Sequence, residues 1–334
     1  MAFFAFIIRV IVTGILTIAT AIAPAQMADA MAPNAPLDAD NCKLNFAVLS
    51  DAHVRTDYAG FVNNLVLNLT MNDFEYSEGR YDGIVFVGDN TDHGYEEQWE
   101  RLYSIMNVYD PAENVYFAMG NHDTWTRDES GDTTFKELFV EYTSKISGTT
   151  IPDIYYSTNI NGYPFIFISS EGDNVNMYMS DEQISWLSAE MEKAAALDKP
   201  IFVVSHWPIN KTHGLPAAWG DEEYNDMTGG IGEQSAQVNE ILQKYENVFY
   251  FSGHIHNGLS NADSKEKLGY ESIEKIGNIY GINLPALHGI NENGAIAPGC
   301  SYAVEVYEDE ILFRARNFMT GYWMPEYNYT VELS

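Results

Sequence analysis

The chain has 334 residues, with 17 Lys and Arg against 48 Asp and Glu, so its formal net charge is −31. Aromatic residues make up 13% of the chain, which excludes a disordered acidic tail, because such segments lack the apolar mass to fold. The charge argues against a nucleic-acid polymer as a partner, since binding a polyanion depends mainly on Lys and Arg.

The first thirty residues form a nearly continuous apolar segment. Val10–Ala23 is typical of a signal-peptide core, and the small residues of Ala28–Ala30 follow it as a cleavage pattern. The sequence therefore predicts a signal peptide over residues 1–30 and a secreted or extracytoplasmic protein. Because Arg9 lies inside the apolar run and no charge precedes it, an uncleaved signal anchor at a membrane is the alternative.

The rest of the chain divides into a short linker and one domain. Residues 31–41 contain two prolines and are expected to be the linker, and residues 42–334 form the domain. Its two cysteines, Cys42 and Cys300, exclude a disulfide-rich scaffold and a Cys-ligated zinc cluster. In an exported protein they could form one disulfide, and two unpaired buried thiols are the open alternative.

Strands alternate with helices along the domain. Short apolar runs predict strands at residues 46–50, 84–87, 115–118, 165–168, 201–204 and 248–251, and strand-like alternation recurs from residue 302 onward. Helical spacing of apolar residues predicts helices around 61–69, 99–106 and 135–142, and Ser180 with Gln183 predicts a capping box that opens another. This order indicates an α/β fold of two sheets flanked by helices.

Polar residues with metal-binding side chains follow five of these strands. The clusters are Asp51-Ala-His53, Gly88-Asp89-Asn-Thr-Asp92, Gly120-Asn121-His122-Asp123, Ser205-His206 and Gly253-His254-Ile-His256. In α/β sheets, sites form outside the carboxyl ends of strands, so we expect the five clusters to meet in one crevice. Carboxylates mixed with imidazoles suit Mn, Fe or Zn.

In this order the motifs resemble those of the metallophosphoesterases, also called calcineurin-like phosphoesterases. The resemblance covers roughly residues 44 to 260. It implies a four-layer α/β/β/α fold, in which helices flank a two-sheet β-sandwich, and it implies two metal ions. The residues that it implies as ligands are Asp51, His53 and His256 for the first ion, Asn121, His206 and His254 for the second, and Asp89 as the bridge.

The resemblance also implies a reaction, the hydrolysis of a phosphate ester by a hydroxide that bridges the ions. Two ions roughly 3.5–4 Å apart need a shared anion, and a carboxylate has one oxygen for each. His122 would lie next to the leaving group, oriented by Asp123 or Asp92, and would supply its proton. The expected substrate is a small phosphate ester.

Two positions of the motifs differ from those of related phosphatases and indicate which enzyme class the chain resembles. His93 stands where protein Ser/Thr phosphatases of the superfamily carry Arg, and Asp92 stands where purple acid phosphatases carry a metal-binding Tyr. The chain therefore looks most like a phosphodiesterase of the cyclic-nucleotide type. The alternatives are a phosphomonoesterase, either nucleotidase or acid-phosphatase-like, and a non-catalytic binding scaffold.

Two further features have a role that the motifs do not define. The stretch from Trp207 to Gly232 is either a lid whose aromatic residues stack on a nucleobase or an ordinary surface loop. His288 matches no motif and is interpreted as a structural histidine.

Overall fold

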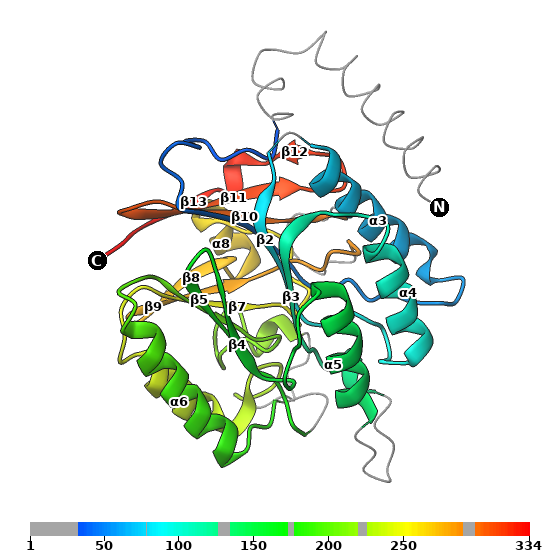
Figure 1. The fold of residues 1–334 in the computed structure, drawn as a ribbon. Helices are drawn as coiled ribbons and strands as arrows, with labels where there is room; N and C mark the ends of the chain where they lie inside the picture. Colours follow the sequence, from blue (N-terminus) through cyan, green and yellow to red (C-terminus); the bar gives the residue numbers. More distant parts are fainter. Residues whose placement is uncertain (1–32, 78, 126–133, 173–176, 220–225, 290–297) are drawn as a thin grey trace.

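Two β-sheets pack face to face, and helices cover their outer faces (Figure 1). The computed structural model describes residues 33–77, 79–125, 134–172, 177–219, 226–289 and 298–334. The expected α/β/β/α sandwich is confirmed. The signal peptide predicted over residues 1–30 lies outside the described residues. Within the described part of the chain, every helix is too short or too polar to cross a bilayer.

The first sheet contains the first three strands of the chain and its last four. Its order is β12-β11-β10-β1-β2-β3, with β13 paired to β11. The parallel strands are β1 (Leu44–Leu49), β2 (Tyr81–Val87) and β3 (Ala112–Ala118). The antiparallel strands are β10 (Cys300–Val306), β11 (Glu310–Asn317), β12 (Tyr322–Trp323) and β13 (Tyr329–Glu332). The helices on this side are α3 (Gly60–Tyr76), α4 (Glu96–Met106) and α5 (Thr134–Ser147).

The second sheet has the order β4-β5-β6-β7-β9-β8. Its strands are β4 (Tyr156–Ile160), β5 (Tyr163–Phe167), β6 (Ile201–Val204), β7 (Val248–Ser252), β8 (Ile273–Ile276) and β9 (Ile279–Asn283). The later helices are α6 (Asp181–Ala195), α7 (Ser235–Leu242) and α8 (Ala262–Leu268). Single 3₁₀ turns occur at His122–Thr124, Ala217–Trp219, Gly232–Gln234 and Pro325–Tyr327.

Aromatic side chains fill the space between the sheets. Phe46 of β1 packs edge to face on Phe165 of β5 and Phe202 of β6, with ring centroids 5.1 and 5.0 Å apart. All three side chains are fully buried. Because strands buried on both faces need no polar alternation, most of β1, β2, β6 and β7 consists of consecutive apolar residues, as in Phe46–Leu49 and Ile84–Val87. The core fixes the two sheets relative to each other, and thereby fixes the loops at their carboxyl ends.

The strand register rules out a disulfide between the two cysteines. β1 and β10 pair antiparallel with Leu44 opposite Val306 and Val48 opposite Tyr302. Cys42 and Cys300 therefore lie at opposite ends of this strand pair, about eight residues or roughly 25 Å apart. A disulfide joins Cα atoms within about 7 Å of each other. Both cysteines are free thiols.

The linker expected over residues 31–41 is anchored to the domain from its first described residues. Asn34 is buried and donates from Nδ2 to Oδ2 of Asp73 at 3.1 Å. The backbone N–H of Leu37 donates to Oε2 of Glu305 at 3.0 Å. These hydrogen bonds fix the stretch against α3 and β10.

Two local expectations need correction. Ser180 does cap α6 by accepting the N–H of Gln183, but the Gln183 side chain donates to Glu171 and not back to Ser180. The N–H of Ser180 also donates to Glu171, so a carboxylate from outside the helix completes the cap. In the proposed lid, Trp207 is fully buried, so it cannot stack on a substrate.

Candidate metal centre

The five polar clusters meet at the carboxyl ends of β1, β2, β3, β6 and β7, where the two sheets face each other. Backbone hydrogen bonds continue past the strand ends and fix the loops to one another. The N–H of Asp51 donates to the carbonyl of Gly88, and the N–H of His53 donates to that of Asp89. From the second sheet, the N–H of Gly253 donates to the carbonyl of His206.

Four of the predicted ligands surround one space. Oδ1 of Asp51 lies 3.0 Å from Nε2 of His256, and the two Nε2 atoms of His53 and His256 are 3.3 Å apart. Nε2 of His53 lies 3.5 Å from Oδ2 of Asp89 and 3.7 Å from Oδ1 of Asp51. Donors bound to one ion at about 2.0–2.2 Å lie about 2.8–3.6 Å apart. These donors therefore have nearly the spacing that a single transition-metal ion requires.

Two of the remaining predicted ligands, His206 and His254, surround a second space together with Asp89. Ligand atoms of Asp89, His206 and His254 lie within 4.8 Å of one another, and Nε2 of His206 is 3.1 Å from Oδ2 of Asp89. Oδ1 of Asn121 is buried and accepts no hydrogen bond from any described residue. A buried carbonyl oxygen without a donor is costly, and a cation would satisfy it.

Asp89 contributes to both spaces, but through one oxygen. Its Oδ2 faces His53 on one side and His206 on the other, at 3.5 and 3.1 Å. Its Oδ1 accepts the backbone N–H of His122 at 2.8 Å. The sequence predicts one carboxylate oxygen for each ion, whereas in the described geometry Oδ2 is the oxygen that contacts both donor groups.

The backbone at the site is held in a sparsely populated conformation. Five of the predicted ligands have a positive φ between 43° and 72°, namely Asp51, His53, Asp89, His254 and His256. Non-glycine residues rarely adopt this region, and such strain persists only where the surrounding structure enforces it. The hydrogen bonds between the loops supply that enforcement.

Two glycines allow the backbone to pass close to the carboxylates. A Cβ atom at Gly120 would collide with the backbone N and Oδ1 of Asp89. A Cβ atom at Gly253 would collide with Ser50 and with Oδ2 of Asp51. The glycines that follow the strands thus matter here for close approach, as well as for sharp turns.

The carboxylates make the site strongly attractive to cations. Burial disfavours the charged form of His53, but hydrogen bonds to Asp51 and Asp92 outweigh it and raise its pKa to about 10. Burial likewise opposes charge on His206, but Asp89 and Asp51 raise its pKa to about 9. Metal binding displaces protons from imidazoles, so the potential that holds protons here would also hold a metal ion.

Two other residues of the site, Asp51 and His254, have lowered pKa values. Burial favours neutral Asp51, yet the charges of His256 and His206 keep its pKa well below the usual value. Burial and the charge of His206 lower the pKa of His254 to about 3, so its imidazole is neutral, as a ligand must be.

Neighbouring groups orient two of the ligand imidazoles. His206 donates from Nδ1 to the carbonyl of Val87 at 2.9 Å, so its Nε2 is the nitrogen directed to the site. Nδ1 of His53 lies 3.3 Å from Oδ1 of Asp92. Such contacts to the second ring nitrogen fix the tautomer and the ring orientation of metal-binding histidines.

His122 lies beside the candidate ligands. Its Nδ1–H donates to the backbone carbonyl of Asp92 at 2.8 Å, so Asp92 orients it through the main chain and not through its carboxylate. The ring packs edge to face on His53, with centroids 4.5 Å apart, and Trp125 stacks on it at 4.1 Å. Burial lowers the pKa of His122 below its usual value.

The carboxylate of Asp123 fixes the loops that carry His122 and Asp89. It accepts the backbone N–H groups of Asn90, Thr91 and Gly120, and also side-chain hydrogen bonds from Asn90 and Thr91. Burial, assisted by the charge of Asp89, raises its pKa to about 6. All of the described hydrogen bonds to this carboxylate come from Asn90, Thr91 and Gly120. Among the described contacts, Asp123 therefore fixes the loops and does not bind the His122 ring.

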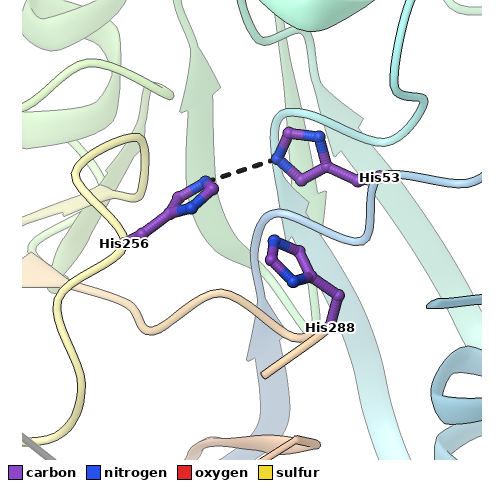
Figure 2. A group of neighbouring side chains, drawn as sticks. All are labelled: His53, His256 and His288. Carbon is purple, nitrogen blue, oxygen red and sulfur yellow. Dashed lines mark hydrogen bonds between the residues drawn. The ribbon is translucent and has the colours of Figure 1, made fainter. Parts of the chain in front are cut away.

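Two histidines at the site were not assigned to it from the sequence. His288 is buried, with its ring centroid 5.0 Å from that of His53 and 5.2 Å from that of His256 (Figure 2). The structure therefore adds His288 to the residues that lie beside the candidate ligands. His93 places Nδ1 2.7 Å from Oδ2 of Asp92. His288 follows β9, so the rule that polar residues at strand ends form sites would have found it had that strand been predicted.

The donor set fits two transition-metal ions. Asp51, His53 and His256 would hold one ion, Asn121, His206 and His254 the other, and Asp89 both. Hard carboxylate and amide oxygens combined with imidazoles suit Mn, Fe or Zn.

Known proteins resemble this chain in sequence and in fold. A family model for calcineurin-like phosphoesterases matches residues 44–258. The chain is 23% identical over 228 residues to a mouse acid sphingomyelinase-like phosphodiesterase 3b, covering 57% of this chain and 46% of that protein. It is 26% identical over 167 residues to a probable cyclic nucleotide phosphodiesterase of Rhodococcus erythropolis, covering 48% and 51%. The chain thus spans about half the length of these curated relatives.

A solved structure shares the fold. It is a dimetal phosphatase from Danio rerio, with a TM-score of 0.57, 13% sequence identity, and coverage of 88% of this chain and 100% of that one.

Proposed function

The chain belongs to the calcineurin-like phosphoesterase family and is a metal-dependent phosphoester hydrolase, and we propose that it is a dinuclear phosphodiesterase. The observation that carries this proposal is the spacing of four donors. Donor atoms of Asp51, His53, Asp89 and His256 all lie within 4.8 Å of one another, and four of their contacts are 3.0–3.7 Å long. The Asp89 oxygen among them also faces His206. When bound, two ions would supply positive charge for the phosphate and would lower the pKa of the attacking water.

The chain's own residues position the ions and the substrate. His53 and His206 present Nε2 because their Nδ1 atoms face Asp92 and the Val87 carbonyl. The ring of His122 packs on that of His53, with centroids 4.5 Å apart, so a phosphate bound at the ions would lie near His122.

His122 is the group proposed to act on the leaving oxygen. With Nδ1–H held by the Asp92 carbonyl, Nε2 is the atom that would take up a proton and pass it to the departing alkoxide. Burial alone favours the neutral ring. A phosphate anion bound within about 4–6 Å would favour the protonated form, so the proton would be held when substrate is present.

A diester is favoured over a monoester by the limited positive charge that the side chains supply. A phosphate diester carries one negative charge, whereas a monoester carries up to two. Among the described Lys and Arg residues, Arg55 has an ion pair with a site residue, and its guanidinium is paired with both Asp57 and Asp92, at 2.5 and 2.9 Å. It would therefore add little charge for a second phosphate oxyanion.

The finer proposal is a phosphodiesterase of the cyclic-nucleotide type. Trp125 stacks on His122 and is 41% exposed, and Tyr95 stacks on His93 and is 46% exposed. Exposed aromatic rings beside the proposed leaving-group histidine could support a flat group such as a nucleobase. The printed name of the Rhodococcus erythropolis relative is consistent with this class. A phosphomonoesterase is the alternative.

We also propose that the protein is exported. The apolar Val10–Ala23 segment and the Ala28–Ala30 pattern support cleavage after Ala30. N-terminal sequencing of protein from the extracytoplasmic fraction tests this. An intact Met1 on membrane-bound protein would support the signal anchor instead.

The catalytic proposal is tested by comparing bis(p-nitrophenyl) phosphate with p-nitrophenyl phosphate, using protein loaded with Mn²⁺, Zn²⁺ or Fe. We expect kcat/KM for the diester to exceed that for the monoester. The reverse preference would favour the phosphomonoesterase. Absence of turnover of both esters, with metals bound, would favour a non-catalytic scaffold.

A further inference from the structure

His288 reaches the metal centre on a segment that crosses both sheets. After β9 ends at Asn283, the N–H of Leu284 donates to the carbonyl of Ser252 at the end of β7. The N–H of Leu287 then donates to the carbonyl of Ser50, directly after β1, and Ala286 forms a parallel bridge with Ser50. These hydrogen bonds hold the segment across the two strand ends that precede Asp51 and His254.

Three imidazoles consequently face one space. Figure 2 shows the ring of His288 directed toward the gap between His53 and His256. Ligand nitrogens of the three residues lie within 4.8 Å of one another, and the rings contact each other edge to face. His288 is 8% exposed, so its ring is confined to this position.

The contact of His53 with Asp92 determines which of its ring nitrogens faces His256 and His288. Nδ1 of His53 is directed to Asp92, so its Nε2 is the nitrogen that faces Nε2 of His256 at 3.3 Å. Both Nε2 atoms belong to the donor group that also contains Asp51 and Asp89. The group of His53, His256 and His288 shares these two imidazoles with the group of Asp51, His53, Asp89 and His256, so His288 would approach the same ion from the side of the imidazoles and not of the carboxylates.

We propose that His288 is an additional protein ligand of the metal ion held by Asp51, His53, Asp89 and His256. The inference rests on the proposed dinuclear centre and deepens it. A third imidazole shifts the donor set of this ion toward nitrogen, which favours Zn²⁺, Co²⁺ or Fe over Mg²⁺ and Ca²⁺. It also occupies a position that water or substrate would otherwise take, so the substrate would depend more on the second ion.

The test is a titration of the metal-free full-length protein with Co²⁺ alone, followed by chelator competition and visible absorption. The wild type is expected to bind two equivalents. In His288→Ala, one equivalent should bind at least 10–100-fold more weakly, the loss typical even for residues that only support a ligand, while the other equivalent keeps its affinity. The visible absorption per Co²⁺ should rise, because a lower coordination number gives more intense bands.

Two further variants keep the test decisive. His213→Ala removes another buried histidine, one held by Glu271 and Glu274 outside the centre, and should leave both affinities unchanged. If His288→Ala lowers the melting temperature of the metal-free protein, His288→Gln replaces it, since Gln retains polarity and much of the volume.

The outcomes separate this inference from the proposed function. Two tight equivalents with unchanged spectra in both His288 variants would overturn the ligand role of His288 and leave the dinuclear centre standing. A raised KM for the diester at unchanged Co²⁺ affinity would also overturn it, because it would place His288 on the substrate. Fewer than two equivalents in the wild type would overturn the dinuclear centre, and the inference with it.

Discussion

Asp89 accepts the backbone N–H of His122 on Oδ1 at 2.8 Å, so its Oδ2 alone faces both groups of metal-binding side chains. This hydrogen bond links the bridging carboxylate to the histidine proposed to act on the leaving group. A change at Asp89 is therefore expected to affect the metal ions and the position of His122 together.

Asp89→Asn should lower activity more than replacement of an outer ligand such as His53. The carbonyl oxygen of the introduced amide can still accept the His122 N–H, and the amide NH₂, which binds metals poorly, would then take the place of Oδ2. Metal content by elemental analysis should fall at both sites, whereas His53→Ala should weaken mainly one. Two metals per chain with near-normal turnover in Asp89→Asn would show that the bridge is assigned wrongly.

His122→Ala should keep both metals and the fold but lower kcat by about 10²–10⁴, the usual range for a lost general acid. The deficit should shrink for p-nitrophenyl esters, which leave readily without a proton, and stay large for alkyl or ribose esters. The measurement is rate against leaving-group pKa for the wild type and the variant. Equal slopes would rule out the acid role.

Thr124→Ala is a matched control for the His122 variant. Thr124 lies in the same 3₁₀ turn and donates to the carbonyl of Asn121. A loss caused by loosening this turn would appear in both variants and would be independent of the leaving group. A dependence on leaving-group pKa that appears only in His122→Ala therefore reports on the proton.

Asp73→Ala should lower the free energy of unfolding by about 3–5 kcal/mol, because it removes the carboxylate that is paired with the buried Arg316 guanidinium. Arg316 on β11 donates to Asp73 on α3 at 3.2–3.3 Å, and both side chains are at most 2% exposed. Urea unfolding measures the change. Lys145→Ala, which breaks an exposed helical pair with Glu141, is the control and should have little effect.

His213 should make stability fall as the pH drops below the ordinary histidine pKa. Burial lowers the pKa of His213 from 6.5. Below that value the unfolded chain binds a proton that the folded chain does not, so acid favours unfolding. His213→Asn should therefore show a smaller decline in unfolding free energy between about pH 7.5 and 5. Parallel pH curves for the two proteins would contradict this.

The strands and the ligand clusters could be predicted because their signals are local. A buried strand reads as an apolar run, and the polar residues after it stand beside it in the sequence, as Asp51 and His53 follow β1. The meeting of the clusters follows from a general rule about strand ends and needs no knowledge of the contacts.

The remaining features depend on contacts between distant segments. β9 is short and contains Gly281, so its sequence gives no clear strand signal, and His288, five residues after Asn283, matches no motif. The roles of Asp123 and of Gln183 depend on which donor or acceptor comes within reach after folding. No sequence spacing encodes those partners.

The central claim is that seven side chains hold two ions at which a phosphodiester is cleaved. It is tested most directly by returning metal to chelated, full-length protein while measuring kcat/KM for bis(p-nitrophenyl) phosphate. We expect no activity without metal and a rise that ends at two equivalents per chain. Full activity at one equivalent, or without metal, would contradict it.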